Sequence, residues 1–224
     1  MAVITISRQH GSGGREIAAR VCDILQYHYF DKRLMAEAMA EQHVTEADIT
    51  DYHEDAYKLR GFLDRLLGYR RPTTIADVGF WDKRPEAVKE VEVAALEEHL
   101  AVWLVQAAIK SAYERGNIVI VGRGGQVVLA DRPGVLHVRI EAPLEVRVRR
   151  VAERDRLSLK DAQEVVINRD KASAEYLKRF YGVDWSDPLL YHLVINSGKW
   201  DVEAAARCIA SAVSCLPALP GKRE

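Results

Sequence analysis

The chain has 224 residues, of which 48% are hydrophobic and 29% charged, a composition typical of a folded domain and not of a disordered chain. Thirty-two Lys and Arg face thirty-three Asp and Glu, and the net charge of −1 argues against a general nucleic-acid binder or a protein bound to anionic membranes. The three cysteines form no Cys-x-x-Cys pair, which argues against a disulfide scaffold or a zinc site. We therefore expect a cytoplasmic protein that binds neither nucleic acid nor membrane.

The first thirty-one residues have the pattern of strand, glycine loop, helix and strand. A β-branched run at 3–7 predicts a buried strand, and a glycine-rich stretch follows it at 8–14. Apolar residues at helical spacing begin after Arg15, and a short strand end is expected at 29–30. This order is typical of the opening of a parallel α/β sheet.

The middle of the chain, from residue 32 to about 115, is mainly helical in pattern. Residues 71–85 have no clear period and predict a loop, whereas 86–115 fit one long helix that ends at Gly116. The apolar stripe of this helix is compatible with burial inside the chain or with pairing in a homodimer.

The last hundred residues alternate strands and helices again. Strands are expected at 118–121, 135–140 and 191–195, and helices from Pro143, from Ser158 towards Phe180, and at 202–213. The sequence therefore predicts an α/β fold with a central parallel sheet flanked by helices.

The glycine loop is the first candidate site, because Gly11, Gly13 and Gly14 let backbone amides approach a phosphate at the start of a helix. A tight turn that merely requires glycine is the alternative. The dinucleotide-binding pattern Gly-x-Gly-x-x-Gly fits Gly11 and Gly13, with Asp31 as the ribose acid, but Glu16 replaces the third glycine.

The nucleotide-kinase pattern Gly-x-x-x-x-Gly-Lys-Ser/Thr is also met only in part. If Gly13 is its second glycine, then Arg8 stands at the first glycine, Gly14 at the lysine and Arg15 at the hydroxyl residue. The loop alone therefore indicates phosphate more strongly than it indicates a reaction.

Arginines supply two further candidates. Arg123 lies in a glycine-rich turn after the strand at 118–121, at the sheet edge where α/β proteins bind ligands, although a surface arginine is the alternative. Arg147, Arg150 and Arg154 share one helical face. The stretch 139–179 holds eleven basic residues against eight acids, so a solvated, salt-bridged face is equally compatible with the pattern.

Arg169 and Arg179 follow on the next predicted helix, ten residues and about 15 Å apart if that helix is unbroken. At 100° per residue they would not share a face, so their joint action on one group requires a break between them. Several arginines around one phosphoryl group would neutralise the charge on its oxygens.

Together these segments resemble the cytidylate kinase-like family. The resemblance rests most on Ser-Arg-Gln-His-Gly-Ser-Gly-Gly at 7–14, and covers nearly the whole chain, least clearly residues 44–90. The other matching segments are 4–6, 15–18, 29–31, 121–125, 168–173, 176–179 and 187–188.

The resemblance implies a three-layer P-loop kinase-like fold in a single domain over 1–224. Its core would be 1–43 and 86–216, with a helical substrate-binding insertion at about 44–85 and a lid at about 154–187. It implies ATP and Mg²⁺ as cofactors, and transfer of the ATP γ-phosphate to a nucleoside monophosphate, with CMP or dCMP as the best guess.

The resemblance also implies roles for individual residues. Substrate-binding residues would be Asp31, Arg33 and Arg123, and Mg²⁺ would be placed by Ser12 and Asp31. Catalytic residues would be Arg15, Arg123, Arg169 and Arg179. The ATP phosphates would be held by Arg8, Gly11, Ser12, Gly13, Gly14, Arg15 and Glu16.

Three positions depart from the family pattern. Gly14 replaces the lysine that bridges phosphates, Arg15 replaces the magnesium-binding hydroxyl, and Gly124 stands where cytidylate kinases have the aspartate of Gly-Arg-Asp. Arg15 or Arg8 could supply the missing cation. The alternative functions are a nucleotide-binding regulatory module that has lost transfer, and a nicotinamide-dependent dehydrogenase, which Glu16 and the arginines fit poorly.

Overall fold

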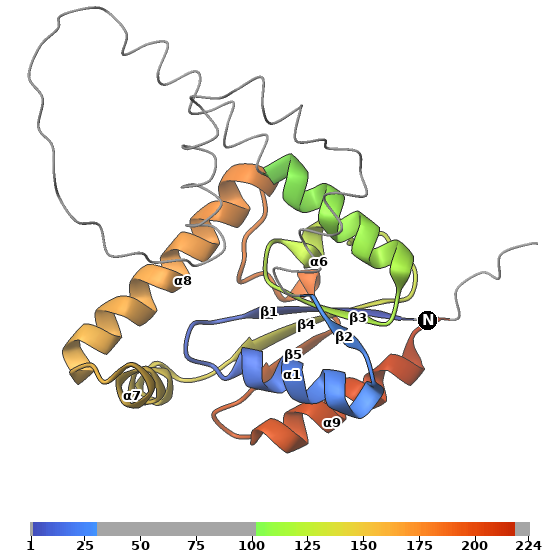
Figure 1. Ribbon diagram of the computed structural model, residues 1–224. Coiled ribbons are helices and arrows are strands. Elements are labelled where there is room, and N and C mark those ends of the chain that lie inside the picture. The colour runs from blue at the N-terminus through green and yellow to red at the C-terminus, as the bar shows by residue number, and fades with distance from the viewer. Residues whose placement is uncertain (1, 31–101, 218–224) are drawn as a thin grey trace, which may run out of the picture.

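The computed structural model describes residues 2–30 and 102–217, and in this part of the chain five parallel strands form one sheet. Their order across the sheet is β2-β3-β1-β4-β5, so β1 lies in the centre (Figure 1). The strands are β1 Val3–Arg8, β2 His28–Tyr29, β3 Ile118–Val121, β4 Val135–Glu141 and β5 Leu193–Asn196. The predicted parallel α/β sheet is confirmed.

Helices cover both faces of the sheet and give the fold three layers. On one face lie α1 (Gly14–Leu25) and α9 (Val202–Ala212), which pack side by side; on the other lie α6 (Gly125–Val128) and a helix over residues 102–115 (Figure 1). Short 3₁₀ turns, Pro188–Leu190 and Val213–Cys215, follow α8 and α9. The sequence did not predict α6.

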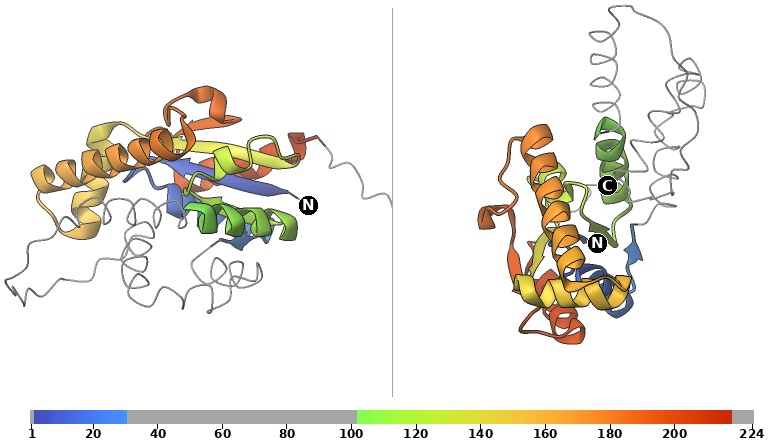
Figure 2. Two further views of the ribbon diagram at one scale, coloured as in Figure 1. Left: turned by 90° about the horizontal axis from the view of Figure 1, so that it is seen from above. Right: turned by 90° about the vertical axis from the view of Figure 1, so that its left-hand side faces the viewer.

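A helical hairpin extends past the carboxyl ends of the strands. It consists of α7 (Leu144–Asp155) and α8 (Leu159–Tyr181), and Figure 2 shows α8 reaching from α7 back towards the helix over 102–115. Val148 and Val151 of α7 pack on Ala162 and Val166 of α8 in a small core of their own. The two helices of the hairpin are thus held to each other by apolar contacts of their own.

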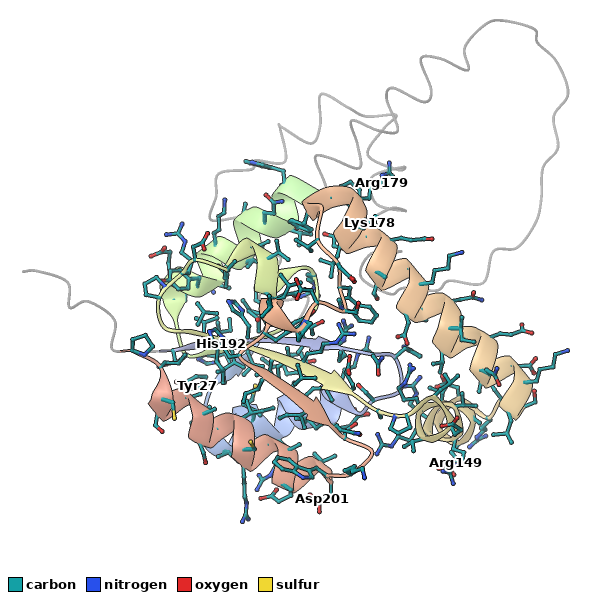
Figure 3. The ribbon with its side chains drawn as sticks, turned by 180° about the vertical axis from the view of Figure 1, so that it is seen from behind. Tyr27, Arg149, Lys178, Arg179, His192 and Asp201 are labelled. Atoms are coloured by element: carbon teal, nitrogen blue, oxygen red, sulfur yellow. The ribbon has the colours of Figure 1, made fainter. Side chains whose placement is uncertain are left out.

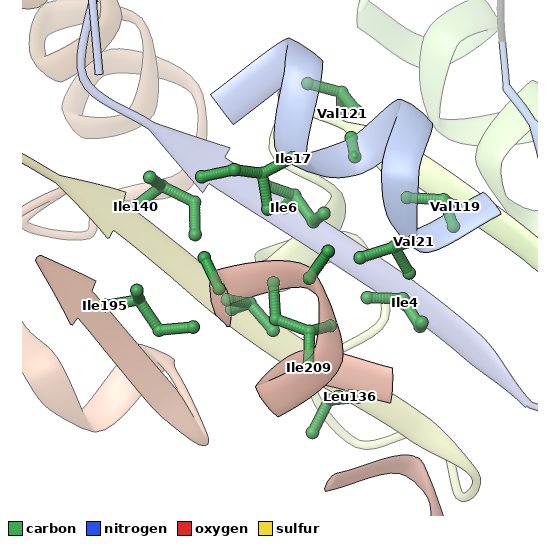
Figure 4. Close-up of a cluster of buried hydrophobic side chains, with 14 of the residues drawn as sticks. Ile4, Ile6, Ile17, Val21, Val119, Val121, Leu136, Ile140, Ile195 and Ile209 are labelled. Carbon is green, nitrogen blue, oxygen red and sulfur yellow. The ribbon is translucent and has the colours of Figure 1, made fainter. Parts of the chain in front are cut away.

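Alternation of side chains along the strands produces two cores, one on each face. Ile4 and Ile6 of β1 point towards α1 and α9 (Figure 4), whereas Val3 points to the opposite core. The first core is completed chiefly by Ile17, Ala18, Val21, Val119, Val121, Leu136, Val138, Ile140, Ala206 and Ile209. Because β1 is buried on both faces, its carboxyl end is a rigid platform for the loop that follows.

Local signals set the helix ends. Ser158 caps α8 by accepting a hydrogen bond from the Asp161 amide at 3.1 Å, and Asp201 caps α9 in the same way through Ala204 at 2.7 Å. Pro143 precedes α7, as predicted. α8 runs for 23 residues without interruption, so the break that joint action of Arg169 and Arg179 would require is absent.

Several predicted segments lie outside the described residues. They are the helical insertion at 44–85, most of the helix at 86–115, and the candidate residues Asp31 and Arg33. In the part of the chain that is described, no helix is both long and apolar enough to cross a bilayer.

We expect Ile6→Ala to lower the free energy of unfolding by about 2–5 kcal/mol, because the deleted atoms leave a cavity in the centre of the sheet. Val194→Ala, on β5 with 48% of the residue exposed, is the matched control and should change it by less than about 1 kcal/mol. Urea denaturation of both variants measures the difference. Equal losses would contradict the assigned core.

Candidate functional site

The loop between β1 and α1 presents unpaired backbone amides to a cleft. Gly11 and Gly13 have left-handed backbones, with φ of 80° and 75°, and Gly13 caps α1 without any side-chain hydrogen bond. Two hydrogen bonds of Ser12 fix the loop. Its hydroxyl donates to the Gln9 carbonyl at 2.8 Å, and the Ser197 hydroxyl donates to the Ser12 carbonyl at 2.5 Å. The positive end of α1 is therefore open to an anion.

Gly11 is needed for packing as well as for its backbone conformation. A Cβ atom at this position would lie 2.8 Å from the Arg147 carbonyl oxygen and 2.9 Å from Val151 Cγ2. Both atoms belong to α7, so any other residue at position 11 would push the hairpin away from the loop.

The loop after β3 places Arg123 at the same cleft. Gly122, Arg123 and Gly124 are successive left-handed residues, with φ of 74°, 59° and 74°. For an arginine this conformation costs about 1 kcal/mol, and such strain is concentrated at functional sites. The guanidinium lies 5.5 Å from the Phe30 ring centroid and donates to the Phe30 carbonyl at 3.3 Å. Arg123 is thus held in a conformation that the chain alone would not favour.

Gly124 packs against the far end of α8. A Cβ atom there would lie 2.9 Å from the Tyr181 ring, which stacks edge-on against Tyr176 with ring centroids 5.9 Å apart. The space that an aspartate side chain would take at this position is therefore occupied by an aromatic ring.

A buried ion pair fastens the hairpin to the glycine loop. Arg147 Nη1 lies 2.5 Å from Asp170 Oδ2 and donates to the His10 carbonyl at 3.2 Å, while Asp170 Oδ1 accepts the His10 amide at 2.8 Å. Arg147 is buried in these contacts. It therefore holds the loop in place and does not point into the cleft with its two helical neighbours.

Those neighbours, Arg150 and Arg154, do face the cleft. Arg150 donates to the Ser197 carbonyl at 2.8 Å, and its Nη1 lies 3.7 Å from where a Cβ of Gly13 would be. Arg154 forms an ion pair with Asp155 at 2.7 Å. The predicted arginine face is thus divided between one structural residue and two residues at the site.

One cleft brings together all the site residues that the family resemblance implies, as far as the structure describes them. They are Arg8, Gly11, Ser12, Gly13, Gly14, Arg15, Glu16, Arg123, Arg169 and Arg179. Other lining residues that the sequence analysis did not single out as site residues include Lys178, Ser197, Trp200 and Asp201. Their position after β5, at the carboxyl edge of the sheet, is the signal that could have found the last three.

The two arginines of α8 lie at different levels of the cleft. Figure 3 shows Lys178 and Arg179 near one end of α8, whereas Arg149 on α7 marks the other end of the hairpin. Arg169 lies close enough to His10 to lower the pKa of that imidazole. Arg169 therefore lies on the side of the cleft formed by the glycine loop, and Arg179 lies on the far side.

The electrostatics of the cleft favour a bound anion. Burial, followed by repulsion from Arg15 and from Arg123, lowers the pKa of the Arg8 guanidinium to about 10. Burial and the nearby Arg154 lower the pKa of His10 to about 4. Arg8 is charged and His10 neutral at pH 7, so an anion would relieve repulsion among cations that already share a small volume.

The sequence profile of the cytidylate kinase-like family matches residues 3–199. The chain belongs to this family. Its sheet and flanking helices are those of a P-loop kinase-like fold, and family membership supports a nucleotide kinase function. Membership of this family argues against the dinucleotide-binding alternative for the glycine loop.

Named relatives are cytidylate kinases of archaea. That of Methanocaldococcus jannaschii is 33% identical over 106 residues, which are 46% of this chain and 59% of the relative. That of Thermococcus kodakarensis is 26% identical over 215 residues, 96% of this chain and 89% of the relative. The matches to the first five relatives span 53–60% of their lengths.

Among solved structures, an uncharacterized protein from Eubacterium ventriosum has the same fold. The superposition has a TM-score of 0.60 at 20% identity, and covers 96% of this chain and 99% of the other. At this identity the likeness concerns the fold alone.

The cleft fits the phosphates of ATP better than it fits a divalent cation on its own. Open amides and several guanidiniums suit phosphate oxygens, whereas no cluster of three or more His, Cys, Asp or Glu side chains occurs in residues 2–30 and 102–217. Ser12 offers a hydroxyl oxygen, but its proton is used within the loop. Mg²⁺ in kinases is held largely by phosphates and water, so a set of resident acids is not required.

We expect His10→Gln to flatten the pH dependence of stability between about pH 6.5 and about pH 4. The folded protein lowers the pKa of His10 to about 4, so the unfolded chain binds a proton first and wild-type stability falls as pH drops through this window. Urea denaturation at pH 7 and pH 5 gives the difference for each protein. Identical differences in wild type and variant would contradict the assigned environment.

We expect Asp170→Ala to lower the free energy of unfolding by about 3 kcal/mol, because it leaves the buried Arg147 guanidinium without its partner. Lys171→Ala is the matched control on the next residue of α8; its ion pair with Glu175 is exposed, so the loss should be below about 0.5 kcal/mol. Denaturant unfolding measures both. Arg147→Met combined with Asp170→Ala should lose less than Asp170→Ala alone, and a larger loss would contradict this assignment.

Proposed function

We propose that the protein is a phosphotransferase of the cytidylate kinase type, which moves the γ-phosphate of ATP to a nucleoside monophosphate, with CMP or dCMP as acceptor. The observation that carries the proposal is that arginines from four elements line one cleft: the end of β1, the start of α1, the β3 loop and the α7–α8 hairpin. Membership of the family and the archaeal cytidylate kinases among its relatives support the same function.

The ATP phosphates would lie on the glycine loop. The amides at the start of α1 would donate to them, with Arg8, Arg15 and Glu16 around the loop and Arg150 and Arg154 on the side of α7. Phosphoryl transfer depends mainly on positioning and on neutralising charge, and these groups are suited to both.

The acceptor would lie on the other side of the cleft. Arg123 would hold its phosphate, since it lines the cleft and its guanidinium is positioned there by contacts with Phe30. Asp31, Arg33 and the insertion at 44–85 would contact the nucleoside; all three lie outside the described residues.

The segment 154–187 would act as a lid that excludes water. Because α8 is continuous, Arg169 would act on the ATP phosphates near His10, while Arg179 would act near the acceptor. Mg²⁺, held by the phosphates with Ser12 and Asp31, would neutralise part of the phosphate charge. The chain's own residues bind and orient both phosphate groups.

A second candidate is a nucleotide-binding regulatory module that binds ATP without transferring its phosphate. The observation that favours it is the loop itself, in which Gly14 and Arg15 replace the lysine and the hydroxyl residue of ordinary P-loop kinases.

A coupled ADP-release assay with ATP, Mg²⁺ and a panel of nucleoside monophosphates distinguishes the two. The phosphotransferase produces ADP only when an acceptor is present, and the accepted base identifies the substrate. ATP binding by calorimetry without transfer to any monophosphate would reject the first proposal in favour of the second.

We expect Arg123→Ala to lower kcat/KM by about 100-fold or more, because it removes a positioned cation from the acceptor phosphate. Arg132→Ala is the matched control: Arg132 is exposed, 5.7 Å from the Tyr113 ring centroid, and away from the cleft. Both variants should stay folded by circular dichroism. Equal turnover in the two would remove Arg123 from the site.

A further inference from the structure

The side chain of Arg8 fills the space beside residue 14. A Cβ atom on Gly14 would lie 2.6 Å from Arg8 Cβ and 2.9 Å from Arg8 Cγ, closer than non-bonded carbons approach. These atoms are the fixed stem of the side chain, and Arg8 is the last residue of β1, in register with Ile140 of β4. The stem cannot swing aside without disturbing the centre of the sheet.

Gly14 is not required by its backbone. It is the first residue of α1 and is absent from the residues with positive φ, so any L residue could adopt its conformation. What excludes a side chain at position 14 is therefore Arg8. A residue larger than glycine at 14 and an arginine at 8 are mutually exclusive.

The other end of Arg8 reaches the β3 loop. A Cβ atom on Gly122 would collide with Arg8 Nη1, so the side chain runs from β1 across the start of α1 to the end of β3. Arg8 lines the cleft along this path. Arg15, in contrast, is exposed on the surface of α1.

The two positions correspond to fixed places in the ordinary kinase loop Gly-x-x-x-x-Gly-Lys-Ser/Thr. With Gly13 as the second glycine, position 8 is the first glycine and position 14 is the lysine. In that loop a small residue at the end of the strand leaves room for a long cation at the start of the helix. In this chain the long cation is at the end of the strand and the small residue at the start of the helix.

We propose that Arg8 and Gly14 are a reciprocal exchange, in which Arg8 delivers from β1 the phosphate-bridging cation that kinases usually deliver from the start of the helix. This inference deepens the proposed function and rests on it. It assigns the role to Arg8 and not to Arg15. Gly14 makes room for the stem of the Arg8 side chain, and Gly122 makes room for its guanidinium.

The surroundings of Arg8 suit this role. No acid in residues 2–30 and 102–217 forms an ion pair with it, and burial with repulsion from Arg15 and Arg123 lowers its pKa to about 10. The group stays charged at neutral pH, and its guanidinium is enclosed beside Gly122. A cation fixed in advance in a poorly solvated site stabilises developing charge most strongly.

The test is a cycle of four proteins: wild type, Arg8→Gly, Gly14→Lys, and the double variant Arg8→Gly/Gly14→Lys. We expect Arg8→Gly to lower kcat by about 100-fold or more, because it removes the cation. Gly14→Lys should lower both activity and melting temperature. The double variant, which restores the ordinary arrangement, should recover at least about tenfold in kcat over Arg8→Gly, a coupling that independent sites would not show.

Arg15→Ala is the matched control and should lower kcat far less than Arg8→Gly. Wild-type turnover in Arg8→Gly, or a double variant no better than Arg8→Gly, would overturn the exchange.

A second pair of measurements does not depend on turnover. Gly14→Ala should lower the melting temperature when Arg8 is present, because of the collision, and raise it in the Arg8→Gly background, because alanine favours a helix over glycine. The same sign in both backgrounds would overturn the steric basis.

ATP affinity by calorimetry separates the two proposals. If wild type transfers phosphate to no monophosphate, the phosphotransferase proposal fails, and the exchange still stands if ATP binding is weakened by Arg8→Gly and regained in the double variant. If ATP binds equally to all four proteins, the exchange fails whatever the transfer assay shows.

Discussion

Guanidinium groups that repel one another are held around one cleft, and the remainder of the fold keeps them from moving apart. Arg8 projects from the central strand, Arg15 from the first helix and Arg123 from a strained loop. Burial and repulsion from the other two guanidiniums lower the pKa of Arg8. Each is attached to an element that is packed on the sheet. The hydrophobic core therefore offsets the repulsion, and the cleft is preorganised for an anion in the absence of one.

Hydrogen bonds from α8 and from the segment that follows it join the hairpin of α7 and α8 to β1 and the glycine loop. Asp170 accepts the His10 amide of the glycine loop, and beyond the helix Trp185 Nε1 donates to Ser7 Oγ at 2.8 Å, with the Arg139 guanidinium 4.4 Å from its ring centroid. Both contacts end on β1 or on the loop that follows it. A movement of the hairpin would therefore be transmitted to the glycine loop, and these bonds would couple the proposed lid to the proposed phosphate site.

Much of the fold could be predicted because its signals are local. The alternation in β1, the Ser158 cap and the glycines before α1 lie within a few residues of what they determine. The role of Arg147 could not be predicted in this way. Its spacing groups it with Arg150 and Arg154, but its partner Asp170 is 23 residues away, and only the packing of two helices brings them together.

The departures from the family pattern could not be interpreted from the sequence either, because their explanation lies in contacts between distant residues. In the sequence, Gly14 and Gly124 each replace a functional side chain and indicate loss. In the structure, the Arg8 stem lies beside Gly14 and the Tyr181 ring beside Gly124, so each glycine is matched to a neighbour distant in sequence. Tertiary contacts of this kind leave no periodicity or spacing in the sequence.

The fit of Gly14 to Arg8 and of Gly124 to Tyr181 bears on the choice between a kinase and a regulatory module. A loop released from function would accumulate substitutions without compensating neighbours, and it would not keep cations that repel one another at a cost in stability. The cations of the glycine loop would serve ATP in either protein. Arg123 lies on a separate loop, where it contacts Phe30, and it keeps a left-handed backbone that glycine would adopt without strain. The proposed acceptor phosphate would account for a strained arginine on this loop, because transfer requires a second phosphate group and ATP binding alone does not.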